Sequence, residues 1–319
     1  GDTVTIVHIA RPANYLLLPI QESSKEGLVR LDTGSPADTD MDVRLATDSV
    51  EYYVPFALPQ GSEEATVIIK KVAADALCWD SIRVSDTFDT ANRDKFRPVY
   101  HHTPLYGWMN DANGLVYKDG EYHLYFQYNP YGSVWGNMHW GHSVSKDLVH
   151  WETISYVFQR LTDLPRYDLK EGTVYGRGQW ASSIRYHDGR FYVWFSPNDE
   201  PHRGYIYTAE DPAGEWTLVS RPPHHHDASL FFDDDGKVYL FYGTGQLRQL
   251  KSDLSDVEPG GIDQKIFERD ADEQGLLEGS QAFKHNGRYY VMMISMDWSI
   301  PGRLRREVCY RADQITGPY

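Results

Sequence analysis

The sequence has few cysteines and no long apolar run. Its 319 residues include two cysteines, Cys78 and Cys309, which lie far apart and fit neither a zinc site nor a disulfide framework. We expect both to be free and buried. No run of about 18 apolar residues occurs, so no membrane span is predicted. Residues 1–20 lack the basic-then-apolar layout of a signal peptide, so either the chain is cytosolic or a signal has been removed.

Positive charge is also scarce. The chain has 31 Lys and Arg against 46 Asp and Glu, a formal net charge of −15. A chain of this charge repels nucleic acid and anionic membranes, and we predict neither as a partner. Hydrophobic residues make up 41%, which is enough for a packed core, and aromatic residues make up 14%. An aromatic content this high suits both β-structure and surfaces on which sugars stack.

Short apolar segments separated by turn residues fill the first part of the chain. This pattern predicts a small all-β sandwich over residues 1–95, followed by a polar linker that ends in Pro98. The predicted strands are VTIVHI, YLLLPI, GLVRL, MDVRL, ATVIIKKV and IRVSDTF. No cluster of acids or histidines marks a site here. We expect a second domain over residues 96–319.

The second domain contains a repeat. Asp-Gly or Asn-Gly pairs begin at Asp119, Asp188, Asp235 and Asn286, each between two apolar-aromatic segments. Such pairs are strong hairpin signals, because both residues accept positive φ. Intervals of about 50 to 70 residues with several strands per unit are typical of propeller blades. Four blades are visible, and we predict a β-propeller that is incomplete in this chain.

Acids recur at one position of the repeat. Eight residues before each hairpin pair stand Asp111, Trp180, Asp227 and Glu278. By local pattern Asp111, in WMNDANG, is a turn residue, and the acids could be solvated turn residues in phase by chance. However, the first strand of each blade lines the central channel of a propeller, so equivalent positions converge. Three acids in one cavity repel each other, which indicates chemistry or a bound cation.

Neighbouring carboxylates are the groups that cleave glycosidic bonds. One donates a proton to the leaving oxygen, and the other attacks the sugar or activates water. A third acid can raise the pKa of the first or bind sugar hydroxyls. Nearby tryptophans could stack on sugar faces or belong to the core: Trp108, Trp135, Trp140 and Trp180. The run His224–His226 is not predicted to bind zinc, because three adjacent side chains on an extended strand diverge.

Residues 95–152 closely resemble glycoside hydrolase family 32, the fructan hydrolases and invertases. The resemblance rests on WMNDANG and on YHLYFQYNPYGSVWGNMHWGHSVSKDLVHWE. It implies that Asp111 is the nucleophile and that Asn110, Gln127 and Trp135 line the sugar subsite. Residues 1–95 look like the extra N-terminal domain of some gut-bacterial members. This similarity implies a secreted, periplasmic or cell-surface protein whose signal peptide is absent from this sequence.

From about residue 150 the pattern resembles glycoside hydrolase family 43 instead. The segments are GQWASSIRYHDGRFYVWFS, HHHDASLFFDDDGKVYL, LLEGSQAFKHNGRYYVMM and CYRADQITGPY. Family 43 enzymes act on arabinofuranosides and xylosides with inversion. The resemblance implies that Asp227 tunes the pKa and orients the sugar, and that Glu278 is the general acid. Both families share a five-bladed propeller, so the chain resembles a chimera joined near residues 143–151.

The chain departs from each family. Family 32 has Arg-Asp-Pro at the second acid and Glu-Cys at the third, whereas this chain has His226-Asp227-Ala228 and Glu278-Gly279. We predict a retaining β-fructofuranosidase acting on levan- or inulin-type fructan. The alternatives are an inverting arabinofuranosidase or xylosidase and a non-catalytic carbohydrate-binding propeller.

Further expectations concern the site and its partners. The predicted substrate-binding residues are Asn110, Gln127, Trp135, Trp108, Trp180 and Ser229. No cofactor is predicted, although the family 43 resemblance implies that a structural calcium could occur, with ligands that the sequence does not identify. The substrate is an oligo- or polysaccharide, and another chain could complete the propeller.

Overall fold

The computed structural model describes most of the chain. The described residues are 3–10, 13–35, 38–59, 64–90, 98, 101–137, 139–157, 161, 164–168, 177–271, 275–297, 299 and 304–319. The predicted domain boundary at residues 95 and 96 lies outside them. By packing, the chain divides into two units. One comprises Gly1–Asn110, Gln127–Gly141 and Phe158–Gly176, and the other Asp111–Phe126, His142–Val157 and Arg177–Tyr319.

The N-terminal residues form two antiparallel sheets, as predicted. One sheet has the order β1 (Val4–Ile9), β6 (Ala65–Lys70), β3 (Gly27–Leu31), β4 (Met41–Val43). The other has the order β5 (Tyr52–Ala57), β2 (Tyr15–Ile20), β7 (Arg83–Ser85), and the short helix α1 (Cys78–Ser81) precedes β7. Both sheets contribute to one core, with Leu16, Leu18, Val29, Val67 and Ile69 among its buried members.

Strand β5 was not predicted. Its sequence, YYVPFA, contains Pro55, which cannot donate a backbone hydrogen bond to a sheet. The structure accommodates Pro55 because β5 lies at the edge of its sheet and pairs only with β2 among the described strands, with Leu17 opposite Pro55. The free cysteines also differ from expectation. Cys78 is buried, but Cys309 is exposed, because it lies in the last strand of the last sheet.

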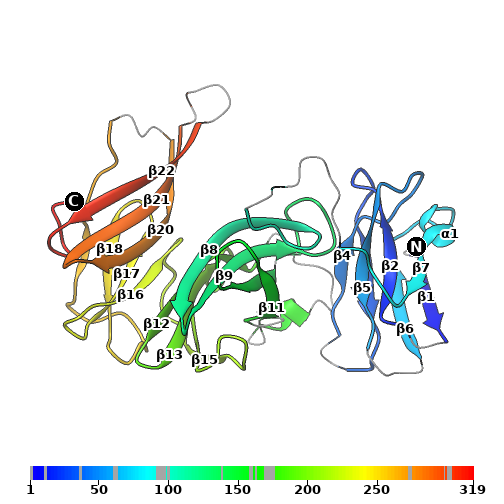
Figure 1. Cartoon of the computed structure of the whole chain (residues 1–319), viewed down its shortest axis with the longest axis horizontal. Helices are drawn as coiled ribbons and strands as arrows, with labels where there is room; N and C mark the ends of the chain where they lie inside the picture. Colours follow the sequence, from blue (N-terminus) through cyan, green and yellow to red (C-terminus); the bar gives the residue numbers. More distant parts are fainter. Residues whose placement is uncertain are drawn as a thin grey trace. The chain divides into compact units, whose positions relative to one another are not determined.

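The rest of the described chain forms four sheets, each a meander in chain order (Figure 1). The first consists of β8 (Trp108–Lys118), β9 (Glu121–Asn129), β10 (His139–Ser145) and β11 (Glu152–Tyr156). The second consists of β12 (Gln179–His187), β13 (Arg190–Pro197), β14 (Tyr205–Ala209) and β15 (Thr217–Ser220), and the one-turn 3₁₀ helix η1 (Pro165–Asp168) precedes it. The third consists of β16 (Ser229–Phe232), β17 (Val238–Tyr242), β18 (Gln246–Leu250) and β19 (Asp263–Lys265). The fourth consists of β20 (Gly275–His285), β21 (Arg288–Asp297) and β22 (Leu304–Ala312). These sheets confirm the all-β prediction and its four blades.

Three of the four predicted turns have both central residues at positive φ. The φ values are 52° and 88° at Asp119-Gly120, 46° and 81° at Asp188-Gly189, and 49° and 75° at Asn286-Gly287. The hairpin at Asp235-Gly236 differs, because only its glycine is left-handed, with φ 78°. Its longer loop is closed by Asp233 N–H to Lys237 O at 2.9 Å and Gly236 N–H to Asp233 O at 3.0 Å. This is a turn with a glycine bulge.

Apolar side chains join successive sheets. Trp194 and Ile206 of the second sheet pack in one buried cluster with Leu230 and Leu240 of the third. A separate cluster joins the third sheet to the fourth and includes Phe231, Phe241, Leu247, Leu277 and Val291. The third sheet is therefore buried on both faces, which is the packing expected of a propeller blade.

Candidate active site

The first strands of the four sheets line a common cavity. Its volume is about 630 Å³, and its walls include Val116 of β8, Arg185 of β12, Phe232 of β16 and Gln281 of β20. A volume of this size lies within the range of small-molecule sites. The predicted acids lie on the same strands or just before them. The three acids are not among the residues that line this cavity, but Asp111 and Glu278 lie near enough to Asp227 to affect its pKa electrostatically.

Each predicted position lies where the strand is irregular. Asp111 in β8 has φ 42° and Asp227, two residues before β16, has φ 47°. Strand β20 bulges between Glu278 and Gln281, and β12 bulges between Gln179 and Ser182, around Trp180. A bulge or a left-handed residue rotates neighbouring side chains out of strict alternation. The backbone thus turns these residues away from the regular pleat.

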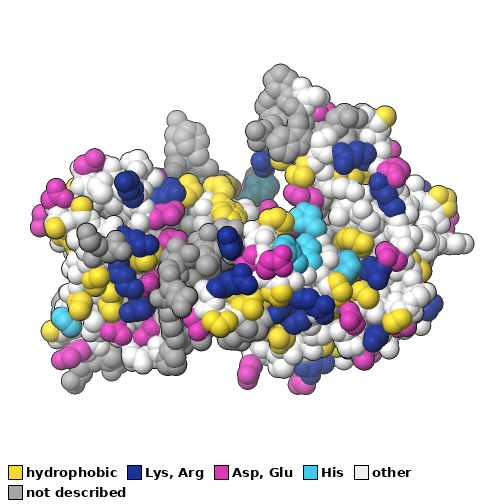
Figure 2. Space-filling view, turned by 180° about the vertical axis from the view of Figure 1, so that it is seen from behind, with side chains coloured by type: hydrophobic (Ala, Val, Ile, Leu, Met, Phe, Trp, Pro, Cys, Tyr) yellow, Lys and Arg dark blue, Asp and Glu magenta, His cyan; other side chains and the backbone are white. Residues whose placement is uncertain are grey.

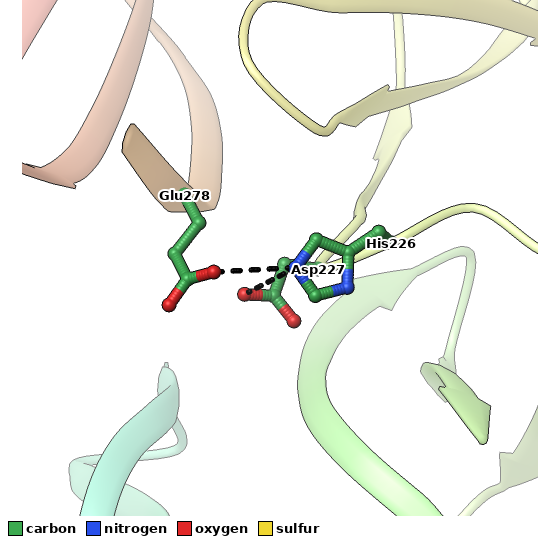
Figure 3. Close-up of side chains that lie close together, drawn as sticks. All are labelled: His226, Asp227 and Glu278. Atoms are coloured by element: carbon green, nitrogen blue, oxygen red, sulfur yellow. Dashed lines mark hydrogen bonds and ion pairs between the residues drawn. The ribbon is translucent and has the colours of Figure 1, made fainter. Parts of the chain in front are cut away.

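His226 lies against two of the acids. Its Nε2 atom is 3.2 Å from Glu278 Oε2, at hydrogen-bond distance, and 3.7 Å from Asp227 Oδ2 (Figure 3). The bond to Glu278 and the negative charges of both acids raise the pKa of His226, although burial opposes them. The Trp180 ring lies 5.2 Å from the imidazole at 72°. The imidazole therefore lies where it can exchange a proton with the Glu278 carboxyl.

The pKa of Asp227 is shifted upward at this site. Burial is the largest cause that raises its pKa to about 6, and the negative charges of Glu278 and Asp111 add to it. The charge of His226 and a hydrogen bond from the Gly279 backbone act in the opposite direction. Asp111 therefore lies within electrostatic range of Asp227. A carboxyl group whose pKa is raised by burial and by neighbouring negative charges is a frequent mark of a functional site.

Sequence reasoning missed His226. It weighed the histidine triplet only as a metal site, and the structure separates its members. His225 is buried, with its Nδ1 2.8 Å from the carbonyl of Pro223, and the His224 ring is 5.6 Å from that of His202. Histidine side chains lie beside acidic ones on the face shown in Figure 2. The available signal was the position of His226 directly before the acid Asp227.

Asn110 and Gln127 are linked to each other and to Trp108. Asn110 Nδ2 donates to Gln127 Oε1 at 2.7 Å, and Trp108 Nε1 donates to Asn110 Oδ1 at 3.0 Å. Trp108 is 36% exposed, Trp135 47% and Trp180 37%, so each ring has a face or edge open to solvent. The open side chains agree with stacking surfaces, whereas Trp140 is buried and belongs to the core.

Ser229 does not have the role expected of it. It is fully buried, and its hydroxyl accepts hydrogen bonds from the guanidinium of Arg185 and from the Ala282 backbone N–H at 3.0 Å. Arg185 also donates to the Ala282 carbonyl at 2.8 Å and to the Ile184 carbonyl at 2.6 Å. Ser229 thus ties β12, β16 and β20 together. Burial in the propeller, which the motif does not reveal, removes this hydroxyl from any substrate.

One group in the described part of the chain has the geometry to hold a metal ion. The ligand atoms of His226, Asp227 and Glu278 lie within 4.8 Å of one another. Two carboxylates and an imidazole suit zinc or another transition metal. However, an ion there would replace the hydrogen bond between His226 and Glu278.

The family models match the two parts of the chain separately. Residues 1–100 match a domain of unknown function, DUF4980, and residues 101–245 match the glycosyl hydrolases family 32 N-terminal domain. The resemblance to family 32 is confirmed. The family 32 match continues to residue 245, beyond the junction expected near residues 143–151.

Curated relatives match short segments at high identity. A levanase from Bacillus subtilis is 61% identical over 92 residues, which are 28% of this chain and 12% of the levanase. An extracellular exo-inulinase from Aspergillus awamori is 60% identical over 57 residues, 18% of this chain and 11% of that protein. The match thus spans about an eighth of these relatives.

Solved structures agree with the family 43 likeness. A protein described as a bifunctional GH43-CE from Bacteroides eggerthii has a TM-score of 0.56 and 32% identity, covering 70% of this chain and 28% of that one. A xylan β-1,4-xylosidase from Bacillus halodurans has a TM-score of 0.52 and 20% identity, covering 70% and 42%, which shows the fold alone. The chain is therefore similar to members of both families in different comparisons.

The described part of the chain contains no helix that is long and apolar enough to cross a membrane.

Proposed function

We propose that this chain carries the catalytic site of a glycoside hydrolase that cleaves β-fructofuranosyl linkages in fructans, with retention of configuration. The observation that carries the proposal is the contact between the predicted acids and His226. Glu278 and Asp227 lie around one imidazole, and the charge of Asp111 acts on Asp227. The high local identity to a levanase and to an exo-inulinase supports fructan over other furanosides.

The mechanism follows from the roles of two carboxyl groups. Asp111 attacks the anomeric carbon while Glu278 gives its proton to the leaving oxygen, so the glycosidic bond breaks as a fructosyl ester forms. Water then attacks the anomeric carbon of this ester while the ionised Glu278 takes a proton from the water. The bond between the sugar and Asp111 breaks, fructose is released, and both carboxyl groups return to their starting states. The contact of His226 with Glu278 holds the Glu278 carboxyl in place. Asp227 binds sugar hydroxyls and stabilises the positive charge that develops on the ring.

A second candidate function rests on the likeness to solved structures. An inverting arabinofuranosidase or xylosidase would use Asp111 as the base for water and Glu278 as the acid. The match at 32% identity to a protein described as GH43 favours this alternative. A third candidate, a carbohydrate-binding propeller, would bind a glycan without cleaving it.

Sugar release from a substrate panel tests these proposals. The panel contains levan, inulin, sucrose, arabinan, and aryl arabinofuranoside and xyloside, and Glu278→Gln is the control. Release from fructans that Glu278→Gln abolishes supports the main proposal. Release only from arabinosides or xylosides favours the second, and NMR of the first-formed anomer separates retention from inversion. Equal glycan binding by both proteins without turnover would support the binding propeller and refute both enzymatic proposals.

Partners and location are proposed on more general grounds. The substrate is a polysaccharide, and the protein acts outside the cytoplasm, as the name of the extracellular exo-inulinase suggests.

No metal is required, so activity should survive treatment with EDTA. Large apolar side chains that do not line the cavity are exposed on β8 and β21, and they support the proposal that further strands, from another chain or segment, cover these sheets: Tyr117 62% and Ile294 47%.

A further inference from the structure

The N-terminal sandwich holds the loop that carries Trp135. Glu22, just after β2, accepts hydrogen bonds from the backbone N–H of Ser133 at 2.7 Å and from the Ser133 hydroxyl at 2.6 Å. The Tyr52 hydroxyl of β5 also donates to Glu22. Partial burial opposes ionisation, but these bonds and the charge of Arg44 hold the pKa of Glu22 below its usual value. An ionised carboxylate therefore anchors the loop at Ser133, two residues before Trp135.

A second attachment lies two residues after Trp135. The Asn137 side chain accepts from the backbone N–H of Asp42 at 3.0 Å and donates to the Asp42 carbonyl at 2.6 Å. The Asn137 amide thus makes the two hydrogen bonds to Asp42 of β4 that a neighbouring strand would otherwise make. Asn137 is buried and has φ 33°, a conformation that Asn tolerates better than most residues. Both backbone groups of Asp42 are satisfied by this one side chain.

The loop is also braced within itself. Asn129 donates to the Val134 carbonyl at 2.9 Å and accepts from the Tyr131 N–H at 3.0 Å. Trp135 therefore has a fixed backbone on both sides while its ring is 47% exposed. An exposed aromatic ring on a fixed backbone is the arrangement that suits stacking on a sugar, because little entropy is lost on binding.

The space beneath the loop is too small for a ligand. The cavity lined by Glu22, Asp42, Arg44, Asn129 and Trp135, with their neighbours, has a volume of about 40 Å³. That volume accommodates a water molecule or two, whereas ligand pockets generally have about 300 Å³ or more. At this contact the sandwich supports the loop and does not bind a sugar itself.

We propose that the DUF4980 domain is a buttress for the substrate loop of the first blade, with Glu22 and Asn137 as positioning residues that fix Trp135 for stacking on a furanose ring. The part played by Trp135 rests on the proposed function. The support of the loop does not, because it depends only on contacts between residues 22–52 and residues 129–137.

Hydrogen exchange tests the support without any substrate. In the full chain, Glu22→Ala should speed exchange of the Ser133 amide and of the loop peptide about tenfold, the effect of losing one ordinary hydrogen bond. Glu22→Gln keeps an oxygen acceptor and should restore much of the protection. Glu26→Ala is the matched control, because Glu26 pairs with Arg44 and makes no hydrogen bond to the described residues 129–137. Unchanged exchange in Glu22→Ala would overturn the buttress.

Kinetics with the substrate that the panel identifies test the purpose of the support. Glu22→Ala should raise KM about fivefold to tenfold with little change in kcat, and Trp135→Ala should do the same. In the Trp135→Ala background, Glu22→Ala should have no further effect, since it acts through that ring. Additive effects on KM, or a fall in kcat alone, would refute action through Trp135. If the panel shows no activity, the proposed function fails, while the exchange result still decides whether the domain supports the loop.

Discussion

Replacing Asp227 with Asn should stabilise the fold at high pH. The pKa of Asp227 is raised from 3.8 to about 6, chiefly by burial, and one pKa unit corresponds to about 1.4 kcal/mol. The ionised carboxylate therefore costs up to about 3 kcal/mol of the free energy of unfolding. Asn has nearly the same shape without the charge. It also accepts the left-handed backbone at this position, where φ is 47°.

The effect must depend on pH with a definite sign. The folded state binds this proton more tightly than the unfolded state does. The contribution to stability is therefore complete below about pH 4 and is lost as pH rises through about 6. Urea unfolding followed by tryptophan fluorescence should show Asp227→Asn more stable than the native protein by about 2 to 3 kcal/mol at pH 8 and by little at pH 4.

Asp233→Asn is the control of opposite sign. Asp233 is also buried, but it accepts hydrogen bonds from Lys284 at 2.8 Å and from Tyr289 at 2.7 Å. Removing its charge should destabilise the protein at pH 8, because a paired ammonium loses a partner. If Asp227→Asn were no more stable than the native protein at pH 8, or equally more stable at both pH values, burial of the Asp227 charge would not be the cause.

Three further predictions concern buried polar groups. His226→Asn removes a positive charge that lowers the pKa of Asp227. The midpoint of the acidic limb in the pH profile for sugar release should therefore shift to higher pH by about one unit, and an unchanged midpoint would refute this. Burial lowers the pKa of His142 to about 3 from 6.5, so the free energy of unfolding should fall as pH drops below about 6.5. Between pH 7.5 and pH 4.5 the native protein should lose about 2 kcal/mol more of this free energy than His142→Phe does, and equal losses would contradict the assignment. Arg185→Met removes the guanidinium that donates to Ser229 and to two backbone carbonyls. The free energy of unfolding, measured in urea at pH 7, should fall by about 2 kcal/mol or more, and an unchanged value would mean that water replaces the guanidinium.

Much of the fold could be predicted because its signals are local. Asp-Gly and Asn-Gly pairs take positive φ more readily than other residues, so they mark hairpins wherever they occur. Alternation of apolar residues marks the strands, because successive side chains of a strand point to opposite faces of the sheet. The constant interval between hairpin and acid then places Asp111, Asp227 and Glu278 on equivalent strands. Each inference needs only a few neighbouring residues.

Other features depended on burial and on contacts between distant segments. Pro55 argues against a strand until its place at a sheet edge is known. Ser229 has the surroundings of a site motif in the sequence, yet the packing of three blades buries its hydroxyl under Arg185. The same packing brings His226 to Glu278, 52 residues away.

The sequence by itself therefore determined most of the strands, most of the turns and the place of the acids in the repeat, since backbone preference and repeat spacing are properties of short segments. Only the tertiary structure decided which polar groups meet. It paired Asn137 with Asp42, 95 residues apart, and Glu22 with Ser133, 111 residues apart. Hydrogen-bond satisfaction and desolvation are properties of the folded chain, and no local pattern encodes them.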